Sequence, residues 1–276
     1  MKQLLDTKIV DLLDLKHTKG DVGIEIEMEL ETPYISTKPF KNVWRLEGDG
    51  SLKVNGVEFV LKKPVEFSYV GTLIDNLKVK LKENDMTILP SIRAGVHVHV
   101  NMQQSTLGQM YNMLGCYYPM ETVLTRFCGN GREGNLFCLR SRDAAGALKR
   151  LELSIKQEAL HYLDTDDIRY AALNIRSLFN YGTLEFRALA TTPDLGLIED
   201  WTKMVQKLKE YSERVNSCWD CMYHISGNGG RSWLMEVFGP ELFAKLDYPD
   251  LERDIIRDSR NCQYLNSLIT EATHND

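Results

Sequence analysis

The sequence predicts an α+β fold with a mainly antiparallel sheet and helices packed against it. Several segments between residues 21 and 190 alternate apolar and polar residues with a period of two, which is typical of half-buried strands. Other segments repeat apolar residues with the period of a helix. Some strand candidates are joined by connections of hairpin length and others by helical segments, and this mixture favours the α+β class.

The expected elements follow one another without an internal repeat or a long polar linker. Alternating segments predict strands at 21–31, 43–47, 56–62, 94–101, 134–140, 169–176 and 183–190. Helical patterns cover 67–84, 104–126, 143–160 and 194–224, and a helical tail covers about 231–270. Pro119 is expected to kink the second of these helices. We therefore expect one domain over residues 1–276, with a short hairpin connection between 176 and 183.

The composition is that of an ordinary globular chain, with 43% hydrophobic and 26% charged residues. The formal net charge is -6, whereas a dedicated nucleic-acid binder is usually basic. A local basic patch is not excluded by this overall charge. Asp6, Asp11 and Asp14 interrupt the N-terminal segment where a signal peptide needs an apolar run, and no run approaches the length of a membrane span. We therefore expect a cytoplasmic protein without a membrane partner.

The first strand candidate carries a row of carboxylates. In "GIEIEMELE" the apolar residues fall on one face, and the opposite face carries Glu25, Glu27, Glu29 and Glu31. Same-face neighbours in a strand lie about 7 Å apart, so ionised carboxylates in a row repel one another unless water or cations separate them. This face is either a solvated strand surface or a bed for hard divalent cations such as Mg²⁺.

The segment "RAGVHVHVN" predicts a second half-buried strand. Three valines form its apolar face, whereas His97, His99 and Asn101 share the opposite face. Two histidines at this spacing are either hydrogen-bonded polar residues or part of a ligand set.

Charged and polar residues alternate with apolar ones in three further strand candidates. After a D-G turn that begins at Asp49, "GVEF" places Glu58 between two apolar neighbours. In the candidates 169–176 and 183–190, pairs of residues share a face: Asn174 with Arg176, and Glu185 with Arg187. Such pairs form either a structural cross-strand ion pair or, where they face inward, a site.

The six cysteines are scattered, which indicates reduced thiols rather than a disulfide scaffold. In "CWDCMYH", Cys218, Cys221 and His224 follow one another at three-residue spacing, as in some metal sites. A second cysteine pair at zinc-finger distance is missing, and the helical pattern favours a buried helix face instead.

Five short motifs occur in one order along residues 21–192: E-x-E, D-G-S followed by G-x-E, H-x-H-x-N, N-x-R and T-x-E-F-R. Together they resemble the glutamine synthetase and glutamate–cysteine ligase superfamily, and in particular its amidoligase family of bacteria and bacteriophages. The N-terminal helix and the helical extension at about 194–270 lie outside the resemblance. It implies a curved sheet with helices on one side, like the catalytic domain of glutamine synthetase. No second acidic motif follows Glu58, which weakens any claim to ammonia as the substrate.

The resemblance also implies roles for individual residues. The implied ligands of Mg²⁺ or Mn²⁺ are Glu25, Glu27, Glu58, His97 and Glu185. The implied contacts to ATP are His99, Arg169 and Arg187. The implied catalytic residues are Arg187 and Arg176, which lie against the transferred phosphoryl group, and Glu185. The implied substrate contacts are Arg132, Asn101 and Asn174.

These residue types suit the ATP- and Mg²⁺-dependent ligation of a carboxylate to an amine through an acyl phosphate. The expected partners are small-molecule or peptide acids and amines, and nucleic acid enters only as a modified-base substrate. One alternative is a non-catalytic binding or scaffold protein that retains the fold. Another alternative is a metal-dependent hydrolase, although a hydrolytic zinc site usually contains a third clustered histidine or a nearby base.

Overall fold

The computed structural model describes residues 2–32, 38–48, 50–52, 55–129, 131–136, 138–141, 143 and 146–274. Asp49, where the expected D-G turn begins, lies outside these residues. Within them, no helix combines the length and the apolar character that crossing a bilayer requires. The described chain joins one antiparallel sheet to a set of helices, which confirms the α+β class predicted from the sequence.

Seven strands form one sheet in the order β2-β3-β1-β5-β7-β6, with β4 paired to the end of β1. All the pairings are antiparallel. The strands are β1 (Val22–Leu30), β2 (Trp44–Glu47), β3 (Gly56–Leu61), β4 (Ile88–Leu89), β5 (Gly95–Asn101), β6 (Leu173–Asn174) and β7 (Thr183–Ala190). The central strands β1, β5 and β7 lie where the alternating segments predict them.

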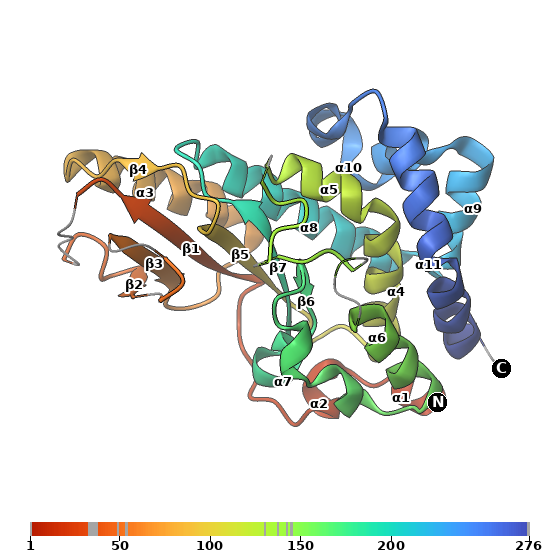
Figure 1. Cartoon of the computed structure of the whole chain (residues 1–276). Coiled ribbons are helices and arrows are strands. Elements are labelled where there is room, and N and C mark those ends of the chain that lie inside the picture. The colour runs from red at the N-terminus through yellow and green to blue at the C-terminus, as the bar shows by residue number, and fades with distance from the viewer. Residues whose placement is uncertain are drawn as a thin grey trace.

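One face of the sheet forms the hydrophobic core. Ile26 on β1, Val98 on β5 and Phe186 on β7 point to this face and are fully buried. Helix α8 (Gly196–Arg214) packs on β5 and β7, and α3 (Val70–Glu83) and α4 (Leu107–Tyr117) pack on α8; α3 and α8 run behind the strands in Figure 1. The other face of the sheet therefore keeps the polar residues of the same strands.

The remaining helices lie at the ends of the chain and beside the core. Helices α9 (Trp219–Asn228), α10 (Gly230–Leu246) and α11 (Leu251–His274) pack on one another, and α11 also packs on α4, α5 (Glu121–Phe127) and α6 (Ala147–Lys156). The N-terminal segment carries α1 (Lys2–Leu5) and α2 (Ile9–Leu12). Short 3-10 helices are η1 (Phe67–Tyr69), η2 (Tyr118–Met120), η3 (Leu160–Leu163) and η4 (Asp166–Ile168). Pro119 lies in η2 between α4 and α5, so the expected interruption is confirmed.

Two strand predictions were wrong. The described part of 134–140 forms turns and one isolated parallel β-bridge between Leu139 and Ala171, because the amides of Arg132, Asn135 and Cys138 each bond a carbonyl three residues earlier. Of the candidate 169–176, only Leu173–Asn174 is a strand, because η4 occupies its approach and the helix α7 (Ser177–Tyr181) begins directly after it.

Two helical connections also differ from the expectation. The expected hairpin connection between 176 and 183 is the helix α7, which ends at Gly182 in a left-handed conformation with φ of 69°. The helix expected over 194–224 is divided into α8 and α9, because Val215 is extended and Ser217 accepts a hydrogen bond from the Trp219 amide at 3.0 Å.

Candidate functional site

The antiparallel register gathers the predicted glutamates and histidines on one face of four adjacent strands. Residues directly opposite each other in an antiparallel pair lie side by side on the same face, so three register pairs build the group. The pairs are Glu25 with His97, Glu27 with Glu58, and His99 with Glu185. We call these six residues the carboxylate–histidine cluster.

His97 lies in the middle of this cluster. Its Nδ1 is 3.1 Å from Oε2 of Glu25 and 3.6 Å from Oε1 of Glu185, and its Nε2 is 3.6 Å from Oε1 of Glu27. The second oxygen of Glu27 accepts a hydrogen bond from the Gly95 amide at 2.7 Å. Both ring nitrogens of His97 therefore face carboxylate oxygens in a buried site.

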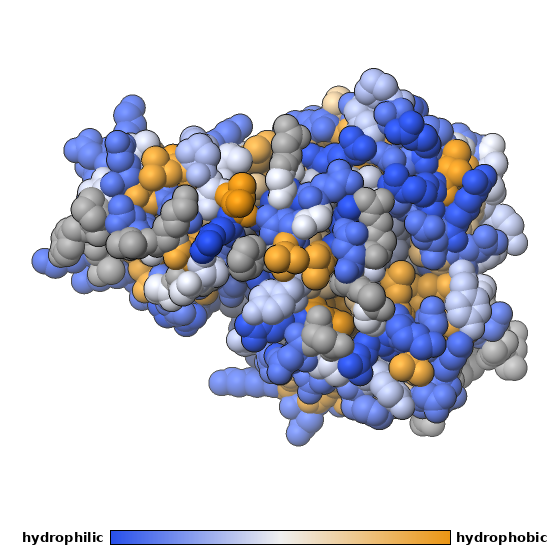
Figure 2. Space-filling model, in the orientation of Figure 1, coloured by the Kyte–Doolittle hydropathy of each residue, from blue (hydrophilic) through white to orange (hydrophobic). Residues whose placement is uncertain are grey.

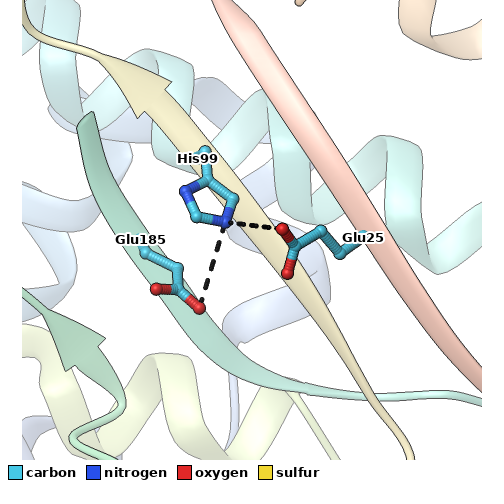
Figure 3. A group of neighbouring side chains, drawn as sticks. All are labelled: Glu25, His99 and Glu185. Carbon is cyan, nitrogen blue, oxygen red and sulfur yellow. Dashed lines mark ion pairs between the residues drawn. The ribbon is translucent and has the colours of Figure 1, made fainter. Parts of the chain in front are cut away.

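His99 lies between two of the carboxylates, and Figure 3 shows that the three side chains come from neighbouring strands. Its Nε2 is 3.4 Å from Oε1 of Glu25 and 4.0 Å from Oε1 of Glu185, while its Nδ1 is 3.2 Å from the Thr183 hydroxyl. Among the described residues, the buried Nε2 has no hydrogen-bond partner. A ring nitrogen that faces two carboxylates in this way needs either a proton or a bound cation.

The cluster changes the ionisation of its own members. Burial raises the pKa of Glu25, but the nearby His97 and His99 outweigh this effect and lower the pKa well below its ordinary value. Burial also raises the pKa of Glu185, whereas the charges of His99, Arg187 and His97 lower it overall. For His99, burial lowers the pKa, and the neighbouring carboxylates raise it overall. Both carboxylates are therefore ionised near neutral pH and attract cations.

Two groups within the cluster have the arrangement of metal ligands. Ligand atoms of Glu25, His99 and Glu185 all lie within 4.8 Å of one another, and so do those of Glu25, Glu58 and His97. Glu25 belongs to both groups, so two ions held there would be close neighbours. The unpartnered Nε2 of His99 belongs to the first group, which supports the fit of these residues to a cation.

A first cavity, which we call the Tyr181 cavity, opens on one part of the cluster. Its volume is about 370 Å³, and Glu25, His99 and Tyr181 line it. The basic and apolar residues of its wall include Lys16, Arg45, Lys62, Leu15, Val60, Leu61 and Pro64, and neutral polar side chains such as Asn101 and Gln103 also line it. In Figure 2 the molecule is hollowed between the part that carries β2 and β3 and the part that carries α2 and α7, where these residues lie.

A second cavity, which we call the arginine cavity, shares no lining residue with the first. Its volume is about 340 Å³, and Glu27, His97 and Asn174 line it. The remaining wall includes four arginines: Arg93, Arg132, Arg169 and Arg187. Because Glu25 and His99 face one cavity and Glu27 and His97 the other, the cluster lies between the two cavities.

Arg187 is tied directly to the cluster. Its Nη1 donates a hydrogen bond to Oε1 of Glu185 and lies 3.5 Å from Nδ1 of His97. The other oxygen of Glu185 accepts a hydrogen bond from the Asn174 amide group at 2.6 Å. Asn174 and Arg187 together hold the Glu185 carboxylate toward the cluster.

Arg132 enters the site from a turn outside the sheet. It is only 2% exposed, and its Nε and Nη2 donate to the carbonyl oxygens of Ala188 and Arg187 at 2.7 and 2.8 Å. These carbonyls lie where the β5–β7 register shifts, so Arg132 supplies hydrogen bonds at an irregular part of the strand pairing. Gly95 makes room for it, because a Cβ there would lie 2.9 Å from Nη2 of Arg132.

Arg176 lies outside the cluster, contrary to the expectation that it shares a strand face with Asn174. It has helical dihedral angles at the start of α7, and its guanidinium pairs with Asp164 and Asp166 at 3.2 and 2.7 Å. The chain leaves β6 after Asn174, so the alternation of a strand no longer applies. Arg176 is therefore not positioned to contact a phosphoryl group at the cluster.

The predicted asparagines are already engaged by the protein. Asn101 lines the Tyr181 cavity, but it donates to the Gly20 carbonyl at 2.8 Å and accepts from the Gln103 amide at 2.9 Å. Asn174 lines the arginine cavity and is held between Glu185 and a backbone amide. Asn101 therefore holds the backbone at Gly20 and Gln103, and Asn174 holds the Glu185 carboxylate and the backbone at Arg176.

The cysteine and histidine group of α9 is separate from the cluster. Cys218 and Cys221 are fully buried, and burial raises the pKa of both thiols. His224 contacts Glu236 at 2.9 Å and Ser232 at 3.1 Å. The burial of both cysteines fits the interpretation as a buried helix face, and within the described part of the chain these residues are in neither group of metal-ligand geometry.

Several lining residues were not identified from the sequence, among them Thr183, Arg93 and Tyr181. Thr183 could have been found, because it precedes Glu185 by two residues on the same strand. Arg93 precedes β5 and Tyr181 ends α7, so neither lies in a segment whose period fixes the direction of its side chain.

Comparison with protein-family models and with curated proteins gives no match for this chain.

Proposed function

We propose that this chain is an ATP- and Mg²⁺-dependent carboxylate–amine ligase that forms an amide through an acyl phosphate, as its resemblance to the amidoligase family implies. The observation that carries the proposal is the pair of ligand groups that share Glu25, lying between two basic cavities. The carboxylate–histidine cluster can bind metal ions, and the basic cavities on either side of it suit substrates with several negative charges.

The cluster suits Mg²⁺ or Mn²⁺. Carboxylate oxygens are preferred ligands of both ions, and imidazole nitrogens add affinity for Mn²⁺. Glu25, His99 and Glu185 would hold one ion, and Glu58 and His97 would join Glu25 at a second. When bound, such ions neutralise the phosphates of ATP and polarise the transferred phosphoryl group.

We assign the nucleoside to the Tyr181 cavity and the acid substrate to the arginine cavity. The apolar side chains and the Tyr181 ring offer the Tyr181 cavity a surface for a base, and its lysines suit phosphates. The arginine cavity has the donors that recognise carboxylates. The two substrates would then meet at the cluster between the cavities.

The reaction would proceed in two steps. A carboxylate oxygen of the acid attacks the γ-phosphorus of ATP, the bond from this phosphorus to the β–γ bridging oxygen breaks, and ADP leaves with the electron pair. The nitrogen of the amine then attacks the acyl carbon, the bond from this carbon to the phosphate oxygen breaks, and one proton passes to solvent. Arg187, fixed by Glu185, would stabilise the charge on the oxygens of the transferred group.

A product assay tests this proposal. ATP, Mg²⁺ and a panel of acids and amines should give ADP and phosphate only when an acid and an amine are both present. Mass spectrometry should find a product equal to the acid plus the amine minus water. Arg187→Ala should lower kcat by roughly 10²-fold, whereas Glu83→Gln, on an exposed position of α3, is the matched control.

Binding of the nucleotide gives an independent test. ATP should stabilise the chain against heat only when Mg²⁺ or Mn²⁺ is present, because the metals hold the phosphates. Equal stabilisation in excess EDTA would count against the metal cluster. Binding of Mg-ATP without turnover across the panel would favour the scaffold alternative, and cleavage of substrates without ATP would favour the hydrolase.

A further inference from the structure

Among the residues that the structure describes, the arginine cavity carries more positive charge than its carboxylates balance. Of the four guanidinium groups in its wall, Arg187 is paired with Glu185. For Arg93, Arg132 and Arg169, no carboxylate partner occurs among the described residues. The remaining acid of the wall, Glu27, uses one oxygen for the Gly95 amide and turns the other to His97.

These three arginines are held in place by neutral groups. Arg132 donates to two backbone carbonyls, and Nη1 of Arg93 donates to the Ser51 carbonyl at 3.0 Å. The Arg169 guanidinium lies over the Tyr170 ring, 4.5 Å from its centroid. Neutral partners orient a guanidinium and leave its charge uncompensated, so the cavity is organised in advance for an anion.

Two guanidinium nitrogens of this wall are buried without a hydrogen-bond partner among the described residues: Nη1 of Arg132 and Nε of Arg187. Leaving a charged donor unsatisfied in a buried site is costly. Both residues line the arginine cavity next to His97, so an anion bound at the cluster end of the cavity would satisfy them. Arg93 and Arg169 are exposed and belong to the outer part of the same cavity.

We infer that the arginine cavity selects an acid with at least two anionic groups. This inference rests on the proposed function and names the class of its acid substrate. One carboxylate, the one that reacts, would lie at the buried end beside Arg132 and Arg187. A second carboxylate or a phosphate on the same molecule would pair with Arg93 and Arg169. A single carboxylate would leave the charge of the outer arginines unbalanced.

Binding without ATP tests the inference separately from the reaction. Thermal shift and calorimetry would compare glutarate and adipate with valerate and hexanoate at constant ionic strength, with inorganic phosphate as a further probe. We expect the diacids to bind at least about 10-fold more tightly than the monoacids of equal length, as for the gain of a charge-assisted hydrogen bond. Tight binding by phosphate alone, with no preference for diacids, would overturn the inference.

Variants locate the second anion. Arg93→Gln should weaken diacid binding about 10-fold and leave monoacid binding unchanged, and Arg93 is exposed, so its replacement leaves the core intact. Arg132→Met should weaken the binding of both diacids and monoacids. Arg253→Gln, on an exposed position of α11, is the matched control.

The two proposals fail in different ways. Equal affinity for diacids and monoacids, or diacid binding that Arg93→Gln leaves unchanged, would overturn the inference even if the ligase reaction is observed. Selective diacid binding without ADP release would support the anion site while contradicting the ligase.

Discussion

Replacing Glu121 with glutamine should remove a loss of stability that we expect of the wild-type chain between about pH 4.5 and pH 7. Glu121 is 5% exposed, and each of its carboxylate oxygens lies 3.0 Å from the amide nitrogen of Ser141. Burial raises the pKa of Glu121, and the Asp258 charge adds to this effect, while the Ser141 hydrogen bonds and Arg140 oppose it. The net result is a pKa of about 7.

The sign of the effect follows from the order in which the two states lose their proton. Below pH 4.5 the carboxyl is protonated in both the folded and the unfolded chain, so its contribution to stability is fully present. Between pH 4.5 and about 7 the unfolded chain ionises first, and the free energy of unfolding falls. Above this range both states are ionised and the loss is complete. The difference between the two pKa values corresponds to about 3 kcal/mol.

Urea denaturation from pH 4 to pH 8 measures this loss. Glutamine cannot ionise and still offers an oxygen to Ser141, so Glu121→Gln should lose about 3 kcal/mol less than the wild type over this range. The quantity to compare is the difference between the two pH profiles, because other groups titrate in both proteins. Glu271→Gln, on an exposed position of α11, is the control. Parallel profiles for wild type and Glu121→Gln would refute the reasoning.

Three further changes test the site and its surroundings. Glu185→Gln removes charge from the cluster and keeps the side-chain shape. It should therefore raise by roughly 10-fold the Mn²⁺ or Mg²⁺ concentration that gives half of the maximal thermal stabilisation, which a metal titration followed by thermal shift measures. Gly95→Ala should displace Arg132, whose Nη2 would lie 2.9 Å from the new Cβ, and lower stability by about 1 kcal/mol in urea. Gly182→Ala should cost about 2 kcal/mol or more in the same assay, because φ is 69° and the new Cβ would lie 2.5 Å from Gln103; unchanged stability would contradict this.

The regular strands could be predicted together with the residues that they present to the site. In β1, β5 and β7 the period of two fixes the face of every side chain, so alternation alone places Glu25, His97 and Glu185 on polar faces. Alternation does not say which residues lie opposite each other. That depends on the register between strands distant in sequence, which pairs His99 with Glu185. The sequence therefore predicts the members of the cluster, and tertiary pairing sets their contacts.

The misplaced Arg176 and the missed Arg93 belong to irregular backbone. Arg176 was assigned a strand face, but α7 starts there and turns it toward Asp164. Arg93 reaches the arginine cavity from a bend before β5, where no period fixes a side chain's direction. Arg132, which the resemblance had implied as a substrate contact, reaches the same cavity from a turn. The cluster that would hold metal is thus built by regular strands, whereas much of the charge facing the acid comes from segments outside them. Because such segments vary more readily than a sheet, the proposed function predicts that acid specificity would change through positions such as Arg93 while the cluster stays the same.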